Sequence, residues 1–233
     1  IEKLQIGYVK TLLEVPLIEL ELGKVYALVG ANGRGKTTLL QTLIGTQPAL
    51  SGKVEIDGEN LTKLSANQKS KTLGFVRSRF DGVSYMRAQE FVALGRLPFT
   101  NALGRLNKKD VSIVKESIKT MEVEHLSEKF TTELSDGERQ MLAIAKVLSQ
   151  GTPYIFLDEP TAFLDYSNKK RVLQLLVKIA QEQNKCILFS SHDLEMTFEY
   201  ADEILYVSRD CNEIKQIAKG DFSLSKLIEN CFP

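Results

Sequence analysis

The chain has 233 residues, 43% of them hydrophobic and 26% charged, which is the composition of a globular protein that buries a sizeable core. Its 30 lysines and arginines balance 30 aspartates and glutamates, and this zero net charge argues against a generally basic nucleic-acid binder. No apolar run approaches the roughly 20 residues of a membrane-spanning helix. Cys186, Cys211 and Cys231 lack metal-ligand spacing and indicate free thiols in a reducing compartment.

The first part of the chain predicts strands followed by a helix. Polar and apolar residues alternate through 4–8 and again through 17–20, a pattern typical of half-buried antiparallel strands. Val25–Val29 is a continuous apolar run, which predicts a strand buried on both faces. Residues 37–45 have the apolar spacing of a helix, and Gly45 is placed to end it.

The middle of the chain has a different pattern. From 88 to 150 the apolar positions follow helical spacing. Asn107 is followed three residues later by Asp110, and this pair predicts the N-cap of one of the helices. The region is therefore predicted to be entirely helical.

Buried strands return after the helical region. Tyr154–Leu157 and 186–189 are strand-sized apolar runs separated by another helical pattern. Alternating strands and helices imply right-handed crossovers and a mostly parallel sheet. We therefore predict an α/β fold, with a core of about residues 1–79 and 151–233 that is interrupted by an all-helical subdomain of about residues 80–150.

A glycine-rich loop lies between the predicted buried strand and its helix. Residues 30–37 read G-A-N-G-R-G-K-T and fit the P-loop pattern G-x-x-x-x-G-K-[ST]. Gly33 and Gly35 let the backbone fold tightly, so that successive N–H groups converge on phosphate oxygens. Lys36 supplies a charge for the β- and γ-phosphates, and the Thr37 hydroxyl can bind Mg²⁺. The alternative is a glycine-rich turn that carries a lysine by chance. The predicted nucleotide-binding residues are Gly30, Asn32, Gly33, Arg34, Gly35, Lys36, Thr37 and Thr38.

Two carboxylates follow the second buried strand. Asp158 and Glu159 lie at its carboxyl end, which is where open α/β sheets bind ligands. We expect Asp158 to hold Mg²⁺ and Glu159 to orient or deprotonate the attacking water. Taken alone, such a pair is as often a solvated loop, and the P-loop favours the functional interpretation.

These motifs stand in a recognisable order: the P-loop, Leu134-Ser-Asp-Gly-Glu138, Asp158-Glu-Pro-Thr161, Phe163-Leu-Asp165 and His192. In that order they resemble the ATPase subunit of ABC transporters, over about residues 4–207. The resemblance implies a P-loop NTPase core, a helical subdomain that carries the signature motif, and ATP and Mg²⁺ as cofactors.

The resemblance also implies roles for individual residues. Tyr8 matches the aromatic residue that stacks on adenine, although an ordinary strand tyrosine is the alternative. His192 matches the switch histidine near the γ-phosphate, so that Glu159, His192 and Lys36 form the expected catalytic set. Asp165 matches a contact across a dimer.

The signature motif is expected to act on ATP bound to a second copy of the chain. Two ATP molecules would then lie between two copies arranged head to tail, each at the N-terminus of the other copy's helix from Glu138 to Ser149. The residues that the resemblance places at this contact are Ser135, Asp136, Gly137 and Glu138.

Local sequence resembles one group of importers. Residues 93–99 and 104–110 resemble the corresponding segments of importers of the iron-siderophore, haem or cobalamin type. Exporters have an acidic, glycine-rich segment before the signature, and residues 129–133 stand in its place here. This resemblance implies that polytopic permease subunits are direct partners and that an extracytoplasmic substrate-binding protein is an indirect one. It implies no nucleic-acid partner. The expected location is cytoplasmic, at the inner face of a bacterial membrane.

Two positions depart from the family pattern. Ser78, flanked by Arg77 and Arg79, stands where a glutamine that binds Mg²⁺ is expected, unless the loop is misaligned by one residue. Asp136 replaces a glycine, and a carboxylate near a γ-phosphate is unfavourable unless it turns away or pairs with a cation. Arg139 is close enough in sequence to be that cation.

Alternatives to an importer ATPase are a module that dimerises on ATP with little turnover and a soluble ATPase of this family that acts on DNA or ribosomes. The presence of Glu159 and His192 favours hydrolysis, and the zero net charge gives nucleic-acid binding no support.

Overall fold

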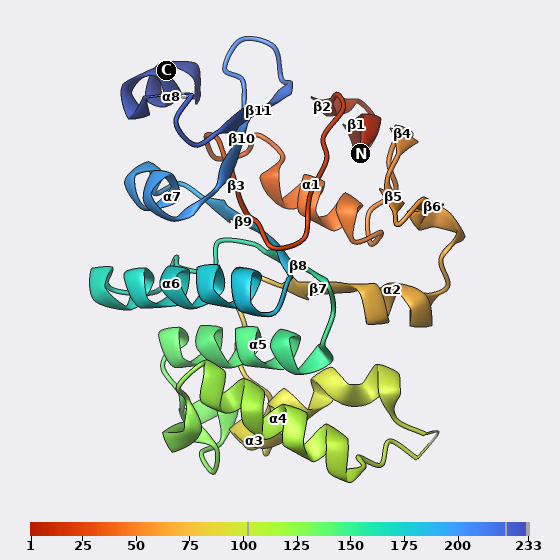
Figure 1. Ribbon diagram of the computed structural model, residues 1–233, viewed down its shortest axis with the longest axis vertical. Coiled ribbons are helices and arrows are strands. Elements are labelled where there is room, and N and C mark those ends of the chain that lie inside the picture. Colours follow the sequence, from red (N-terminus) through yellow and green to blue (C-terminus); the bar gives the residue numbers. More distant parts are fainter. Residues whose placement is uncertain (102, 222, 232–233) are drawn as a thin grey trace.

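The computed structural model describes residues 1–101, 103–221 and 223–231. The strands of its main sheet are β3 (Val25–Val29), β7 (Leu73–Val76), β8 (Tyr154–Leu157), β9 (Cys186–Ser191), β10 (Glu203–Val207) and β11 (Ile214–Ala218). Their order is β11-β10-β3-β9-β8-β7, and every neighbouring pair is parallel except β10 and β11 (Figure 1). The predicted α/β fold with a mostly parallel sheet is confirmed.

Smaller strands lie beside the main sheet. They are β1 (Glu2–Gly7), β2 (Thr11–Val15), β4 (Ser51–Lys53), β5 (Glu55–Ile56) and β6 (Glu59–Asn60). The first three form an antiparallel sheet in the order β2-β1-β4, and the last two form a hairpin. The prediction of antiparallel strands near the N-terminus is therefore correct.

Two predicted strand segments need correction. Residues 17–20 form no strand. Ile18 is buried and exchanges backbone hydrogen bonds with Ile1, and Leu20 packs against the same core, while Leu17 is exposed, so the alternation reflects the docking of two side chains. The sequence also predicts a strand over residues 72–76, but the strand begins at Leu73 and Thr72 is the last residue of a helix. Its hydroxyl donates to the carbonyl of Gln68 one turn earlier, as in a helical segment.

The helices are α1 (Lys36–Leu43), α2 (Ala66–Thr72), α3 (Ala88–Ala93), α4 (Lys108–Thr120), α5 (Asp136–Gln150), α6 (Tyr166–Glu182), α7 (Leu194–Tyr200) and α8 (Leu224–Cys231). Short 3₁₀ turns are η1 (Leu61–Lys63), η2 (Leu94–Phe99), η3 (Glu124–Leu126) and η4 (Thr131–Glu133). The predicted N-cap is confirmed, because Asn107 and Asp110 accept each other's backbone N–H. Among the helices of the described residues, none combines the length and the apolar character needed to cross a bilayer.

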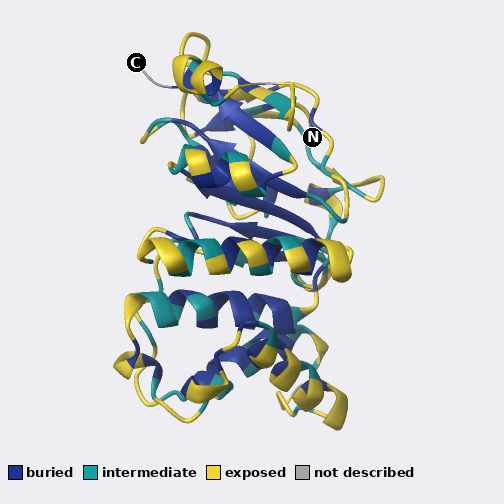
Figure 2. Cartoon of the chain, turned by 60° about the vertical axis from the view of Figure 1, so that its left-hand side comes forward, coloured by how far each residue is buried: buried dark blue, intermediate teal, exposed yellow. Residues whose placement is uncertain are grey.

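The main sheet separates two hydrophobic cores. In β3, Val25, Ala27 and Val29 face one core, and Tyr26 and Leu28 face the other. Successive side chains of β3 are therefore buried on opposite faces of the sheet, which is why this strand is a continuous apolar run. Figure 2 shows the strands buried between helices whose outer faces are exposed.

Helices of the middle region pack on one edge of the sheet. A Cβ atom at Gly74 in β7 would lie 2.4 Å from Cγ1 of Val147, so only glycine permits this approach of α5. Helices α3 and α4 pack in turn on α5, away from the sheet (Figure 1). The predicted boundaries of a helical subdomain at about residues 80 and 150 stay a prediction.

Parallel strands bring chemically different residues to one edge. The chain leaves β3 at Gly30, β7 shortly before Ser78, β8 at Asp158 and β9 just before His192. Because these strands run in the same direction, their carboxyl ends meet along one side of the sheet. The fold therefore gathers the P-loop, the acidic pair and the histidine.

Candidate functional site

The P-loop begins at the end of β3 and leads directly into α1. Gly33 and Gly35 have φ of 77° and 91°, a left-handed conformation that side chains disfavour. The ammonium of Lys36 donates to the carbonyls of Gly30 at 2.7 Å and Ala31 at 3.2 Å, inside the arch of the loop. Burial lowers the pKa of Lys36, while the negative charges of Glu159 and Asp158 act in the opposite direction. The loop thus holds a partly desolvated cation at the N-terminus of α1.

Asp158 is the centre of a hydrogen-bonded cluster. The Thr37 hydroxyl donates to its Oδ2 at 2.8 Å, and the Ser190 hydroxyl donates to its Oδ1 at 2.7 Å. Ser190 also accepts the backbone N–H of Glu159 at 2.9 Å, so a single hydroxyl holds both acidic residues. The structure brings two of the three predicted metal ligands, Thr37 and Asp158, into direct contact. Ser190 was not among the predicted site residues.

Glu159 and His192 face each other across neighbouring strand ends. Nδ1 of His192 lies 3.1 Å from Oε1 of Glu159, and the side chains are 49% and 26% exposed, respectively. Glu159 has φ of 47°, a left-handed conformation that is strained in a residue with a side chain. Such strain persists where the surroundings fix the backbone, and here the bond to Ser190 contributes to that. The geometry holds a carboxylate next to an imidazole at the mouth of the P-loop.

A hollow of about 310 Å³ lies over the P-loop. It is lined by Tyr8, Leu12, Asn32, Gly33, Gly35, Lys36, Thr37, Thr38 and Glu159. Tyr8 is 69% exposed at its rim, so its ring is free to stack on a planar group. The hollow therefore contains most of the residues predicted to bind nucleotide, together with the predicted catalytic carboxylate.

Arg34 has a different position from the one expected for a nucleotide ligand. Its guanidinium donates to Oδ1 of Asn212 at 2.6 Å and to the carbonyl of Arg209 at 2.5 Å. Both partners belong to the turn between β10 and β11, so the side chain points to the C-terminal hairpin and does not line the hollow over the P-loop.

Ser78 lies beyond the end of β7, next to the strand that carries Asp158. Val76 pairs with Leu157, and the N–H of Asp158 donates to the carbonyl of Val76 at 2.9 Å. Ser78 follows two residues later and is half-buried. Its place at this edge fits the predicted metal ligand, and that role remains a prediction.

The signature motif forms the start of α5. The sequence predicts that this helix begins at Glu138, but it begins at Asp136. Ser135 is its N-cap, and the Ser135 hydroxyl accepts the N–H of Glu138 at 3.2 Å. A Cβ atom at Gly137 would lie 2.7 Å from Cδ2 of Leu164, so this glycine allows the signature to touch the segment that ends at Asp165. Asp165 in turn caps α6.

A second hollow, of about 370 Å³, lies over the signature. Its lining includes Ser135, Asp136, Gly137, Glu138 and Asp165. Among the described residues, none lines both this hollow and the one over the P-loop. The predicted site residues of one chain therefore fall into two separate groups.

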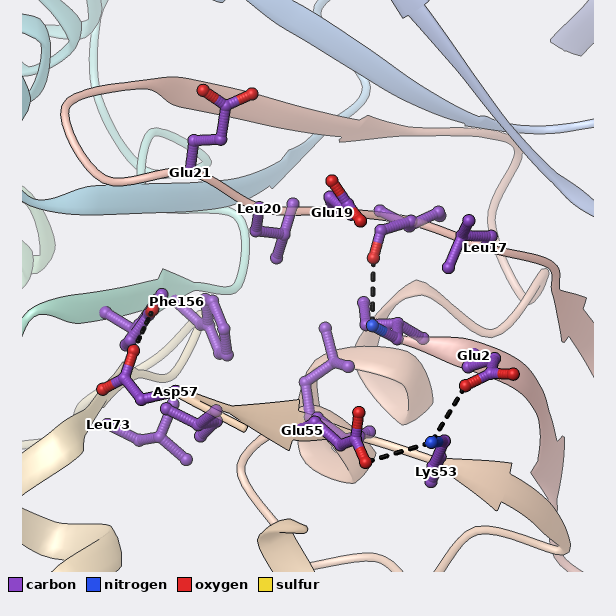
Figure 3. A pocket seen from close by; sticks show the side chains of 16 residues that line it. Glu2, Leu17, Glu19, Leu20, Glu21, Lys53, Glu55, Asp57, Leu73 and Phe156 are labelled. Atoms are coloured by element: carbon purple, nitrogen blue, oxygen red, sulfur yellow. Dashed lines mark hydrogen bonds and ion pairs between the residues drawn. The ribbon is translucent and has the colours of Figure 1, made fainter. Parts of the chain in front are cut away.

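Another hollow, of about 380 Å³, lies beside the β5–β6 hairpin and is unsuited to phosphate (Figure 3). Its lining includes the carboxylates of Glu2, Glu19, Glu21, Glu55 and Asp57. Lys53 also lines it, and its ammonium is paired with Glu2 and Glu55 at 3.0 Å each. Like charge would repel a triphosphate there, which supports the P-loop hollow as the nucleotide site.

Comparison with known proteins agrees with this geometry. The sequence model of the family described as ABC transporter matches residues 15–162. The iron(3+)-hydroxamate import ATP-binding protein of Bacillus subtilis is 32% identical over 209 residues, which cover 89% of this chain and 78% of the relative. The ferric enterobactin transport ATP-binding protein of Escherichia coli is 32% identical over 232 residues, covering 99% and 85%.

Solved structures of the same kind superimpose well. An inward-facing ABC transporter of the metal-chelate type matches with a TM-score of 0.79 and 27% identity, covering 93% of this chain and 82% of that one. A dimeric post-hydrolysis ATP-binding cassette bound to ADP and Pi matches with a TM-score of 0.79 and 25% identity, covering 94% and 97%. The chain therefore belongs to the ABC transporter family, as an ATP-binding subunit that hydrolyses ATP.

Proposed function

We propose that this ATPase works with Mg²⁺ as a head-to-tail homodimer and drives the import of an iron chelate through membrane subunits. One observation carries the proposal: Lys36, Thr37, Asp158, Glu159 and His192 come together at one edge of the sheet. Phosphoryl transfer requires mainly positioning and charge stabilisation, and this cluster offers both.

The oxygen atoms present fit Mg²⁺. The Thr37 hydroxyl and the Asp158 carboxylate are hard donors 2.8 Å apart, and Mg²⁺ in nucleotide sites uses one or two such groups together with phosphates and water. Ser78 is the third candidate ligand, with a side chain shorter than glutamine. The ion, when bound, neutralises charge that develops on the phosphates.

The protein groups around the triphosphate have separate tasks. The ammonium of Lys36 can exchange the P-loop carbonyls for phosphate oxygens, which offer it a full opposite charge. Glu159 orients the attacking water, and His192 holds that carboxylate from the side. Tyr8 provides a face for adenine.

Two separate hollows support the dimer. Each chain has a P-loop hollow without a signature and a signature hollow without a P-loop. A second copy, turned head to tail, supplies Ser135, Asp136, Gly137 and Glu138 to the first copy's ATP, with Asp165 at the contact. A similar solved cassette is dimeric.

The relatives support the cargo and the partners. Two of them are named as import or transport ATP-binding proteins for iron(3+)-hydroxamate and ferric enterobactin. By analogy with them, we infer that this chain binds polytopic permease subunits at the inner face of a bacterial membrane. An extracytoplasmic substrate-binding protein would be an indirect partner, through the permease. Haem and cobalamin remain alternative cargoes, and nucleic acid is not an expected partner.

Phosphate release by the purified chain and by its Glu159→Gln variant tests the proposal. Mg-dependent release that the substitution abolishes, with ATP still bound, is the expected result. Slow release that is equal in both proteins would instead favour a regulatory module that dimerises on ATP. Co-purification of a polytopic membrane protein supports the transport role, whereas co-purification of nucleic acid contradicts it.

A further inference from the structure

We propose that Arg139 is a positioning residue that neutralises the additional carboxylate of Asp136, so that the signature can approach the triphosphate bound to a second copy. This role rests on the ATP-sandwiched homodimer proposed above. It concerns a charge at a position where the family usually has no side chain.

The pair lies at the first turn of α5. Nη2 of Arg139 is 2.5 Å from Oδ1 of Asp136, one helical turn apart. The Asp136 side chain is 47% exposed at the rim of the signature hollow, whereas that of Arg139 is 17% exposed. The guanidinium therefore lies under the carboxylate and anchors it from the protein side.

The start of α5 is already rich in negative charge. Glu138 accepts the N–H of Ser135 at 2.8 Å and its hydroxyl at 2.9 Å, so its carboxylate is held at the helix end by the N-cap residue. Asp136 adds a second carboxylate within the same turn. A γ-phosphate that approaches this turn would meet repulsion unless the added charge is compensated.

A second arginine contributes from another part of the chain. The hydrogen bond from Arg139 holds the pKa of Asp136 below its usual value against the effect of burial, and the charge of Arg79 adds to it. Arg79 belongs to the segment after β7, and Gln140 of α5 donates to the carbonyl of Arg77 in that segment at 3.4 Å. The guanidinium of Arg79 is itself paired with Asp81 at 2.7 Å, so Arg139 is the direct partner of Asp136 and Arg79 acts on that carboxylate at longer range.

The test measures ATP-dependent dimerisation in a Glu159→Gln background that keeps nucleotide bound. Arg139→Gln, Asp136→Asn and the double variant are compared by sedimentation velocity with Mg-ATP, at two salt concentrations. Arg139→Gln should raise the dimer dissociation constant about tenfold or more, because the carboxylate then faces the phosphate without compensation. The double variant should recover to within about threefold of the parent.

Two controls separate charge compensation from folding. Arg105→Gln removes the same charge from an exposed loop and should leave the dimer unchanged. ATP binding to the monomer should be equal in all variants, because Arg139 does not line the P-loop hollow.

Several outcomes would overturn the inference. An Arg139→Gln variant that dimerises like the parent shows that the carboxylate needs no partner. A double variant as weak as Arg139→Gln shows that the arginine only supports the fold of α5. If the parent stays monomeric with ATP, the proposed sandwich dimer is wrong and so is this role of Arg139. If the parent dimerises but the variants do not behave as expected, only the role of Arg139 is wrong.

Discussion

The imidazole of His192 lies against the carboxylate of Glu159, with 3.1 Å between Nδ1 and Oε1. The residues come from the ends of two adjacent parallel strands, β9 and β8, so the sheet itself sets their separation. Glu159 also lines the hollow over the P-loop. The histidine therefore fixes the orientation of the carboxylate that is expected to hold the attacking water.

Replacement of His192 should affect turnover more than nucleotide binding. His192→Ala removes the contact with Glu159, and we expect kcat for ATP hydrolysis to fall about a hundredfold with little change in KM. His192→Gln keeps a hydrogen-bond donor near Glu159 and should retain more of the activity. Equal losses in the two variants, or a rise in KM alone, would contradict this role.

Ser190 should matter for both stability and hydrolysis. Ser190→Ala leaves Oδ1 of Asp158 and the N–H of Glu159 without their shared partner, which should lower the free energy of unfolding by about 1–3 kcal/mol. Turnover should fall about tenfold or more, because both acidic residues lose a support. Denaturant unfolding and steady-state kinetics measure the two effects. Ser191→Ala is the matched control, since the Ser191 hydroxyl accepts the N–H of Asp193 and contacts neither acidic residue among the described hydrogen bonds, so its loss should cost less.

The serine at position 78 is expected to be a weak metal ligand. Ser78→Gln restores a side chain that reaches two bonds further, so basal hydrolysis should stay unchanged or rise by up to about tenfold. The dependence of the rate on Mg²⁺ concentration should shift to lower concentration. A steep loss of hydrolysis would show that the loop from Arg77 to Arg79 is adapted to serine.

Lys36 should cost stability while it enables binding. Burial lowers its pKa in the folded chain, so the unfolded chain binds the proton more tightly and stability rises with pH as the ordinary value of 10.5 is approached from below. Lys36→Met lacks this dependence. Without nucleotide it should melt at an equal or higher temperature than the parent at neutral pH, yet lose the increase in Tm that Mg-ATP produces. A Lys36→Met variant that melts several degrees below the parent without nucleotide would contradict the expectation that Lys36 lowers the stability of the folded chain.

Much of the site could be predicted because its motifs are local. The glycines of the P-loop determine its geometry. Asp158 lies beside Thr37 because each residue follows a buried strand of the same parallel sheet, β8 for Asp158 and β3 for the P-loop. Arg139 was expected to be close enough in sequence to pair with Asp136, and the structure shows this contact.

Other features depend on contacts that no local pattern encodes. Arg34 turns to Asn212, which is 178 residues away, because the β10–β11 turn offers acceptors beside the P-loop. Ser190 lies one residue beyond the predicted strand 186–189, whereas the structure includes it in β9, and its hydroxyl reaches Asp158 because that strand pairs with β8. The segment after β10 has no recognisable motif, and the structure shows it as β11 and α8.

The most direct test of the central claim is the mass and nucleotide content of the Glu159→Gln variant in solution. Sedimentation with Mg-ATP should give a dimer that retains two ATP molecules, and removal of Mg²⁺ or replacement of ATP by ADP should return the monomer. A variant that binds ATP with its P-loop but remains a monomer at every nucleotide and protein concentration would contradict the claim that a second copy completes the site.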